Sequence, residues 1–429
     1  MKPQLMRWTA PAVFAILGAL AAGAMAFAEW KPTDPPNQPM GTPRGIHPGR
    51  VVWIRDPAAA KWDGKTGQWF DDASTDPAVA DAMVSKAIRL VAGAKTDAEA
   101  WKAIFKYYNK TSGRGDAGYK PGEKIAIKLN LNSLGNCNTP QVTAAMVRQL
   151  VKQAGVPEAD VLLSDPSRKQ SEATYAAVHK EFPKVRFEDA SGKHETPAAD
   201  KAAAVHFADP TVVDSGKTYL PASFTSAAYL INMAMLKGHD LAGVTLCAKN
   251  HFGSVFREAD VGMWNKGWSP GNMHNGIDVR KRPMGSHNPL VDLMGHKQLG
   301  GKTVLYFIDA LYGGPDQGAI PARWKSAPFN DGWTASVFAS LDPVAIDSVA
   351  VDFCAAEPTL QPKMTGSVDN YLHEAALAEK PPSGVTYDPE GDGVPLKSLG
   401  VHEHWNNPAK RQYSRNLGTG KGIELVTGE

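Results

Sequence analysis

The segment Lys237–Gly253 places ionisable and amide side chains on both sides of one short apolar run. These side chains are Lys237, His239, Lys249, Asn250 and His251, and the run is Val244–Ala248. A run this short and apolar predicts a buried strand. Because an unpaired buried charge is costly, these side chains need polar partners or a ligand. The segment therefore predicts a functional site at the end of this strand.

Polar side chains also follow the other strands that the sequence predicts. They are Lys128 and Asn130 after the strand at 124–129, Asp165 after 161–164, Asn232 after 228–231, and Asp309 after 303–308. In open α/β sheets, ligands bind outside the carboxyl ends of the strands. We therefore expect these side chains to meet those of the Lys237–Gly253 segment. By contrast, Thr139 and Asp342 are expected to cap the helices that follow them.

The residue types limit the chemistry of this site. Lys128 and Lys249 are point cations suited to a carboxylate, a phosphate or an enolate oxygen, and a desolvated lysine could instead act as a base or Schiff-base amine. His239 and His251 are the acid–base candidates, which makes these four residues the predicted catalytic set. The predicted ligand-binding set is Asn130, Asn232, Lys237, Asn250, Asp165 and Asp309. The two aspartates could pair with the lysines or hold a hard cation.

A divalent metal ion is a candidate cofactor, because five of the twelve histidines lie between positions 239 and 296. Grouped imidazoles suit transition metals, and we take His251, His274 and His287 as candidate ligands. None of them has a ligand spacing on a secure helix, so catalytic or merely hydrogen-bonded histidines remain the alternative. His402-x-His404 is interpreted as part of a structural tail. The chain has three cysteines and no Cys-x-x-Cys, so no iron–sulfur cluster is expected within it.

The predicted strands alternate with predicted helices from residue 124 onward. This alternation predicts an α/β fold with a mostly parallel or mixed sheet, helices on both faces, and long irregular loops. We expect residues 51–429 to form a single large α/β domain. The segment Arg257–Asn288 has no periodicity and is rich in Trp, Gly, His and Asn. It is expected to form an ordered cover over the site.

The N-terminal segment resembles a secretory signal peptide. Residues 1–28 combine a basic start, an apolar run and Ala26-Phe27-Ala28, which predicts cleavage near Ala28 and a periplasmic or secreted protein. An uncleaved N-terminal anchor is the alternative. Residues 29–50 are rich in Pro and predict an extended lead-in. After cleavage the chain holds 44 basic and 44 acidic residues, which argues against nucleic acid as a partner, and no stable membrane span is expected.

Several motifs resemble domain-of-unknown-function family 362 over roughly residues 120–426. They are Ile127-Lys-Leu-Asn130, Lys237-Gly-His239, Gly243-Val-Thr-Leu-Cys-Ala-Lys-Asn-His-Phe-Gly253, Asp309-Ala-Leu-Tyr-Gly313 and Ser340-Leu-Asp-Pro-Val-Ala-Ile-Asp347. The ending Leu399–Asn407 with Tyr413–Leu417 is similar to the exported bacterial branch of that family. The resemblance implies no established activity. Some members carry ferredoxin-type cysteine motifs, which this chain lacks, so a redox role would require a partner protein.

Two functional hypotheses follow from the sequence. In the first, the protein is an enzyme that binds a small anionic or metal-chelated ligand at the strand ends and acts on it by Lys/His acid–base chemistry. In the second, it is a non-catalytic metal- or metabolite-binding accessory protein for a periplasmic redox partner. The convergence of several titratable residue types favours the enzyme.

Overall fold

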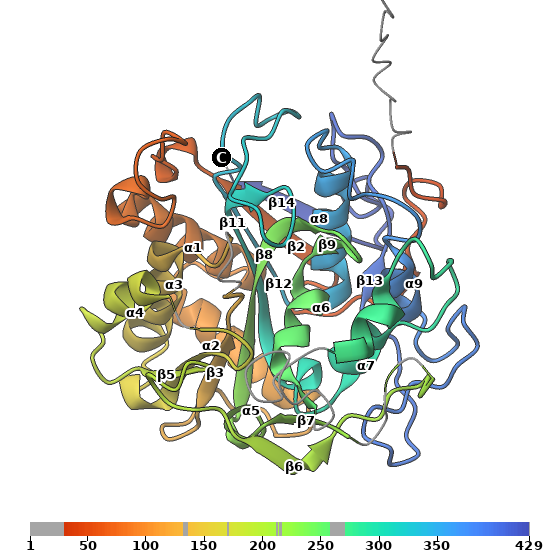
Figure 1. The fold of residues 1–429 in the computed structure, drawn as a ribbon, viewed down its shortest axis with the longest axis horizontal. Helices are drawn as coiled ribbons and strands as arrows, with labels where there is room; N and C mark the ends of the chain where they lie inside the picture. The colour runs from red at the N-terminus through yellow and green to blue at the C-terminus, as the bar shows by residue number, and fades with distance from the viewer. Residues whose placement is uncertain are drawn as a thin grey trace, which may run out of the picture.

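A mixed β-sheet forms the centre of the molecule (Figure 1). The structure, a computed structural model, describes residues 30–131, 136–169, 171–211, 213, 217–257 and 271–428. Within these ranges the sheet has nine strands in the order β14-β2-β12-β11-β8-β3-β4-β5, with β9 paired to β8. Their bounds are β2 Arg50–Arg55, β3 Ile125–Lys128, β4 Val161–Asp165, β5 Arg186–Asp189, β8 Tyr229–His239, β9 Gly243–Thr245, β11 Thr303–Gly314, β12 Ser336–Ser340 and β14 Glu424–Gly428.

Most of this sheet is parallel. Strands β11, β8, β3, β4 and β5 pair in parallel, whereas β12 is antiparallel to both of its neighbours and β9 is antiparallel to β8. The carboxyl ends of β11, β8, β3 and β4 therefore lie on one edge. The first and last strands along the chain, β2 and β14, lie side by side.

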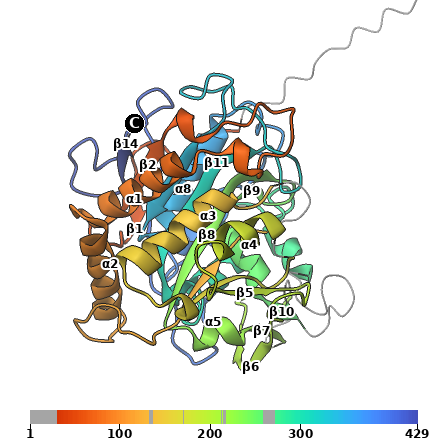
Figure 2. The same ribbon diagram turned by 90° about the vertical axis from the view of Figure 1, so that its left-hand side faces the viewer.

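Helices cover both faces of the sheet (Figures 1 and 2). On one face lie α1 (Pro77–Ala92), α2 (Asp97–Thr111), α3 (Pro140–Arg148) and α4 (Glu172–His179), and on the other lie α6 (Cys247–Asn250), α7 (Pro289–Gly295), α8 (Pro343–Ala355) and α9 (Asn370–Ala376). The side chains of β2 alternate accordingly, with Val51 and Trp53 in one hydrophobic core and Val52 and Ile54 in the other. The predicted α/β fold with a mixed sheet is confirmed.

Smaller elements complete the described chain. Strands β6 (Ala199–Ala204), β7 (Thr218–Pro221) and β10 (Phe256–Arg257) form a separate three-stranded sheet, with α5 (Ala222–Ser226) following β7. Strand β1 (Met40–Gly41) pairs with β13 (Val401–His402) and so joins the lead-in to the C-terminal part of the chain. Residues 1–28 and most of the first half of the Arg257–Asn288 segment lie outside the described residues.

The prediction of a strand over Val244–Ala248 is wrong for the second half of that range. β9 ends at Thr245, and α6 begins at Cys247. The cause is Asp347, whose two carboxylate oxygens accept hydrogen bonds from the backbone amides of Cys247 (2.9 Å) and Ala248 (3.0 Å). A carboxylate at this position satisfies the unpaired amides of a helix N-terminus. Lys249, Asn250 and His251 therefore lie on a helical turn rather than directly after a strand.

The two expected helix caps have different outcomes. Asp342 accepts hydrogen bonds from the amides of Val344 and Ala345 and caps α8, as predicted. Thr139 stands at the cap position of α3, but its side chain makes no capping bond. Its hydroxyl donates to Asp309 instead.

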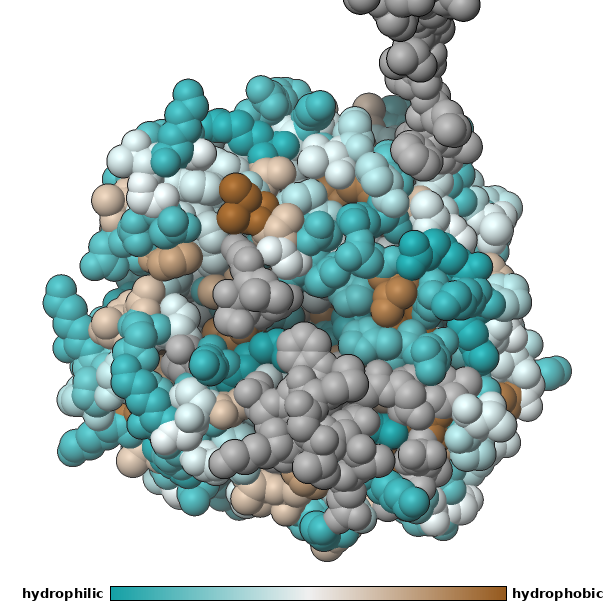
Figure 3. All heavy atoms as spheres, in the orientation of Figure 1, coloured by the Kyte–Doolittle hydropathy of each residue, from teal (hydrophilic) through white to brown (hydrophobic). Residues whose placement is uncertain are grey.

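Hydrophilic side chains cover most of the face shown in Figure 3, and hydrophobic ones are scattered in small groups. No helix in the described ranges combines the length and the hydropathy needed to cross a bilayer. For this part of the chain, the absence of a membrane-spanning helix agrees with the prediction.

Candidate functional site

Most of the predicted site residues lie together where β3 and β8 meet the short helix α6. In the parallel pairing of these strands, Lys128 lies opposite Asn232, so the two side chains start from neighbouring backbone positions. Strand β8 is longer than predicted and continues to His239, which places Asn232 inside the strand and Lys237 near its end. Lys237 in turn lies opposite Gly314 of β11.

The side-chain amide of Asn250 connects helix α6 to strands β3 and β8. Its Oδ1 accepts hydrogen bonds from Lys128 Nζ and Asn130 Nδ2, both at 3.2 Å, and its Nδ2 donates to Asn232 Oδ1 at 2.9 Å. Asn250 is buried and reaches these partners only because Asp347 fixes the start of α6. One amide therefore holds helix α6 against the end of β3 and against Asn232 inside β8.

Lys128 is the one buried lysine of the site that faces a carboxylate. Its Nζ lies 3.4 Å from Asp165 Oδ2, and both side chains are almost fully buried. Asp165 also accepts hydrogen bonds from the amide of Leu131 (2.9 Å) and the hydroxyl of Ser167 (3.1 Å). Burial lowers the pKa of Lys128, and the charge of Asp165 opposes this shift.

Lys237 is buried without a carboxylate at ion-pair distance among the described residues. Its Nζ donates to Asn130 Oδ1 at 3.0 Å and to the backbone carbonyl of Asn136 at 2.6 Å. Two neutral acceptors do not replace the hydration of an ammonium ion, so burial lowers the pKa of Lys237 to about 7. At neutral pH, this lysine exists as a mixture of the charged and neutral forms.

Lys249 is the least satisfied cation of the site. Its Nζ lies 4.0 Å from the centre of the Phe252 ring and makes neither a hydrogen bond nor an ion pair with any described residue. Burial lowers the pKa of Lys249 well below its usual value, and the charges of Arg168, Lys237 and Lys128 lower it further. The basic side chains are thus close enough to repel one another.

His239 is held as a neutral hydrogen-bond donor. Its Nδ1 accepts from the backbone amides of Leu241 (3.0 Å) and Ala242 (3.2 Å), which leaves the ring proton on Nε2. Burial and then the charge of Lys249 lower the pKa of His239 well below its usual value, so the ring stays uncharged. The ring stacks on His274, with 6.0 Å between the ring centres.

His251 is neutral as well. Its Nε2 lies 3.0 Å from Asn232 Nδ2, which also donates to the carbonyl of Cys247. Because Asn232 is the donor, His251 Nε2 accepts and its Nδ1 carries the proton. This Nδ1 is buried and has no hydrogen-bond partner in the described part of the chain. Burial lowers the pKa of His251 to about 3.

Two of the predicted residues lie apart from this network. Asp309 accepts from the amide and the hydroxyl of Thr139 (2.6 and 3.3 Å) and so anchors the start of α3. Burial raises the pKa of Asp309 to about 6. His287 pairs with Asp292 at 2.7 Å beside α7. Across the described ranges, His251, His274 and His287 do not form one group of potential metal ligands.

Several residues that shape the site carry only a weak signal in the sequence. Arg168 adds a fourth positive charge, and its signal was its position three residues after Asp165 at the end of β4. Gly253 approaches the ion pair so closely that a Cβ there would lie 2.6 Å from Asp165 Oδ1 and 2.9 Å from Lys128 Nζ. The role of Asp347 could not be inferred, because its partners lie 100 residues earlier in the chain.

A cavity of about 770 Å³ lies elsewhere, between α1, α3 and α4. It is lined by residues such as Asp72, Gln141 and Arg148 and contains none of the predicted site residues. The pKa shifts of its lining residues Arg148 and Glu181 follow from the ion pair between them, whereas burial without a matching carboxylate lowers the pKa of Lys237 and Lys249. The network is therefore the stronger candidate for chemistry.

Comparison with protein families gives a match over the central part of the chain. The family model described as Domain of unknown function (DUF362) matches residues 125–352, which is more than half of the chain. This range begins at β3 and ends in α8, so it includes every residue of the network described above. No curated protein matches the chain.

Proposed function

We propose that the chain, which belongs to the DUF362 family, binds a small anionic ligand where β3, β8 and α6 meet and acts on it by lysine and histidine acid–base chemistry. The ligand is a carboxylate or a phosphate, free or chelated to a metal ion. We further propose that residues 1–28 direct export, which would place this activity in the periplasm or outside the cell.

The charge balance of the site carries this proposal. Lys128, Lys237 and Lys249 influence one another electrostatically, and Asp165 is the one carboxylate at ion-pair distance from these lysines among the described residues. A folded chain gains nothing by gathering cations that lower one another's pKa. An anion placed among them would offset their repulsion and the cost of their burial. We infer that the missing negative charge belongs to a ligand.

Lys237 and Lys249 are the lysines best suited to contact that ligand. Lys128 is already paired with Asp165. Within the described part of the chain, Lys249 has no polar partner and Lys237 has only neutral ones. Ammonium groups bind carboxylate or phosphate oxygens as compact point charges. His239 adds a neutral Nε2–H donor beside Lys249. Such a donor can stabilise an oxygen on which negative charge develops.

The depressed pKa values also provide for proton transfer. Lys237, with a pKa of about 7, is close to the condition in which a general acid or base works best at neutral pH. Because burial and neighbouring charges lower the pKa of Lys249, the uncharged form of its amine is more accessible and could remove a proton or attack a carbonyl group. An accessory protein that only stores the ligand would share the binding step and would show no turnover.

The test is a binding screen on the protein expressed from its full chain and purified without a tag. Inorganic phosphate, malonate, succinate and citrate are added in turn, and thermal unfolding is followed. We expect at least one anion to raise the unfolding temperature of the wild type and to have little effect on Lys249→Met. If no anion of either class stabilises the wild type, or if Lys249→Met responds equally, the assignment is wrong. Turnover of the bound anion then separates an enzyme from an accessory protein.

A further inference from the structure

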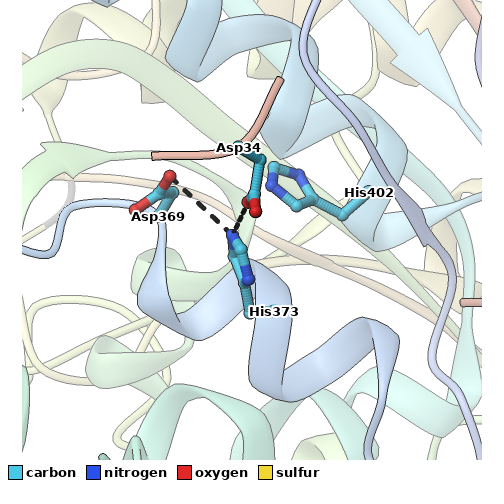
Figure 4. Close-up of side chains that lie close together, drawn as sticks. All are labelled: Asp34, Asp369, His373 and His402. Atoms are coloured by element: carbon cyan, nitrogen blue, oxygen red, sulfur yellow. Dashed lines mark ion pairs between the residues drawn. The ribbon is translucent and has the colours of Figure 1, made fainter. Parts of the chain in front are cut away.

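A second cluster of titratable side chains lies at the junction of the lead-in and the C-terminal part of the chain. It consists of Asp34, Asp369, His373 and His402, and Figure 4 shows these four side chains pointing toward one another. One ligand atom from each residue lies within 4.8 Å of the other three. Asp34 comes from the lead-in, Asp369 and His373 from the start of α9, and His402 from β13.

The converging atoms are not satisfied by hydrogen bonds. His373 Nε2 lies 2.7 Å from Asp34 Oδ2 and 3.9 Å from Asp369 Oδ2, but none of these atoms has a hydrogen-bond partner in the described ranges. The nitrogen and oxygen are therefore close without the alignment of an N–H···O bond. Buried polar atoms of native proteins are almost always paired, so several unpaired atoms around one point require an explanation.

His402 is oriented as a ligand. The hydroxyl of Ser348 donates to the carbonyl of Val344 at 2.7 Å, and so it must accept at its 2.8 Å contact with His402 Nδ1. The proton of the neutral ring is then on Nδ1, and the lone pair of Nε2 is free. His402 is fully buried, and its Nε2 has no partner among the described residues. In metal-binding histidines, one ring nitrogen is typically held by a hydrogen bond while the other binds the ion. Nδ1 and Nε2 of His402 are arranged in this way.

His404 supports the cluster from one side. Its Nδ1 donates to Asp352 Oδ1 at 2.6 Å, and its Nε2 lies 3.4 Å from Asp369 Oδ2. Asp352 is itself fixed by the amide of Trp405 and the hydroxyl of Tyr413. In metal sites, the ligating carboxylates are commonly oriented by hydrogen bonds from neighbouring side chains. The Asp352–His404 pair is placed to orient Asp369 in this way.

We propose that Asp34, Asp369, His373 and His402 bind a divalent transition-metal ion. Two imidazole nitrogens and two carboxylate oxygens suit zinc, whose bonds to such atoms are about 2.0–2.2 Å long and would separate tetrahedral ligands by roughly 3.4 Å. The observed separations, from 2.7 Å to at most 4.8 Å, lie on both sides of that value. Four protein ligands fill a tetrahedral ion, so this site is structural.

The ion would fasten segments that are far apart in sequence. The lead-in is also held by hydrogen bonds, including those from Trp30 to Gln361 and from Arg44 to Asp342, and by the short pairing of β1 with β13. A shared ion among residues 34, 369, 373 and 402 would tie the lead-in to α9 and β13. Because it would bind only the folded chain, it would also raise the stability of the protein.

Zinc stoichiometry and unfolding temperature test this proposal. The full-chain protein is purified without a histidine tag, stripped with dipicolinate, incubated with Zn²⁺, desalted and measured by inductively coupled plasma mass spectrometry. We expect about one zinc per wild-type chain, with a rise in unfolding temperature of about 3 °C when free zinc is near 100 times its Kd. If the wild type retains no zinc and its unfolding temperature does not change, the proposal is refuted.

Three variants localise the ion. Asp369→Asn/His402→Gln should retain no zinc, whereas His287→Gln, which alters a buried histidine paired with Asp292, should retain it fully. Asp34→Asn is included in case the double variant does not fold. This substitution is expected to leave the fold intact, since the Asp34 side chain is 30 % exposed and lies outside the sheet. It should weaken zinc binding at least about tenfold with its circular dichroism spectrum unchanged. Wild-type zinc affinity in both Asp34→Asn and the double variant would overturn the assignment.

Discussion

Replacement of Lys249 by methionine is expected to change ligand affinity and stability in opposite directions. Methionine keeps most of the side-chain length and apolar volume but removes the amine that has no polar partner in the described ranges. A fully buried polar group without a partner costs about 1–3 kcal/mol. Because Lys249 is half-buried, its removal should stabilise the ligand-free protein by about 1 kcal/mol, the lower end of that range. For a chain of this length, this corresponds to a rise of roughly 1 °C in unfolding temperature.

The same substitution should weaken anion binding. A hydrogen bond between an ammonium group and an anion contributes about 1.5–3 kcal/mol, so its loss raises Kd by about 10- to 100-fold. Isothermal titration calorimetry with the anion found in the binding screen measures this change, and differential scanning calorimetry without ligand measures the stability.

Lys193→Met provides the control for removal of a lysine charge. Lys193 is exposed and pairs with the exposed Glu172, so its loss should change stability by less than about 1 kcal/mol and leave Kd unchanged. If Lys249→Met lowers the stability of the ligand-free protein and leaves Kd unchanged, then Lys249 is a structural residue and the reasoning about the site fails.

Three further predictions follow from the same geometry. Because the pKa of Lys237 is about 7 in the folded protein and 10.5 in the unfolded chain, the stability of the ligand-free protein should rise from pH 7 toward pH 10 by up to about 1.4 kcal/mol per unit. Chemical denaturation at several pH values should show this rise, Lys237→Met should lack it, and anion affinity should fall over the same interval. Gly253→Ala should lower the free energy of unfolding by about 1–3 kcal/mol and weaken anion binding, because the added methyl group would collide with the Lys128–Asp165 ion pair. Gly118→Ala is the control: its methyl group would meet open space, so neither stability nor anion binding should change. Asp347→Asn should cost about 1–3 kcal/mol and raise the Kd for the anion, since the start of α6 loses its charged acceptor; an unchanged urea midpoint would contradict this role.

The sequence was sufficient to predict the α/β architecture and to predict that several polar side chains meet near the strand ends. Alternating apolar strands and capped helices predict a layered sheet, and the rule that ligands bind at carboxyl strand ends directs attention to Lys128, Lys237 and Asn250. These side chains do lie in one network. Their proximity could be expected because Lys128 ends β3 and Lys237 lies near the end of the neighbouring strand β8, whereas Asn250 reaches them from helix α6.

The remaining features depend on contacts between distant parts of the chain. Helix α6 could not be distinguished from a strand in the sequence, because its four residues are too few to show a helical or strand periodicity of hydrophobic positions. In addition, the carboxylate that caps it, Asp347, belongs to the distant helix α8. For the same reason, Asp309 follows the strand-end pattern but is used to anchor α3. The cluster at Asp34 and His402 joins residues more than 300 positions apart, and its one sequence signal was His402-x-His404, interpreted as a structural tail.

The most direct test of the proposed function is a measurement of the lysine pKa values by NMR. Protein labelled with ¹³C and ¹⁵N in lysine is titrated from pH 5 to pH 11, and Lys237→Met and Lys249→Met assign the two resonances. We expect Lys237 to titrate near pH 7 and Lys249 to titrate well below the usual range of lysine. Both pKa values should rise when the anion binds. If both lysines titrate near 10.5 and do not respond to any of the anions, they are ordinary hydrated cations and the proposed anion site does not exist.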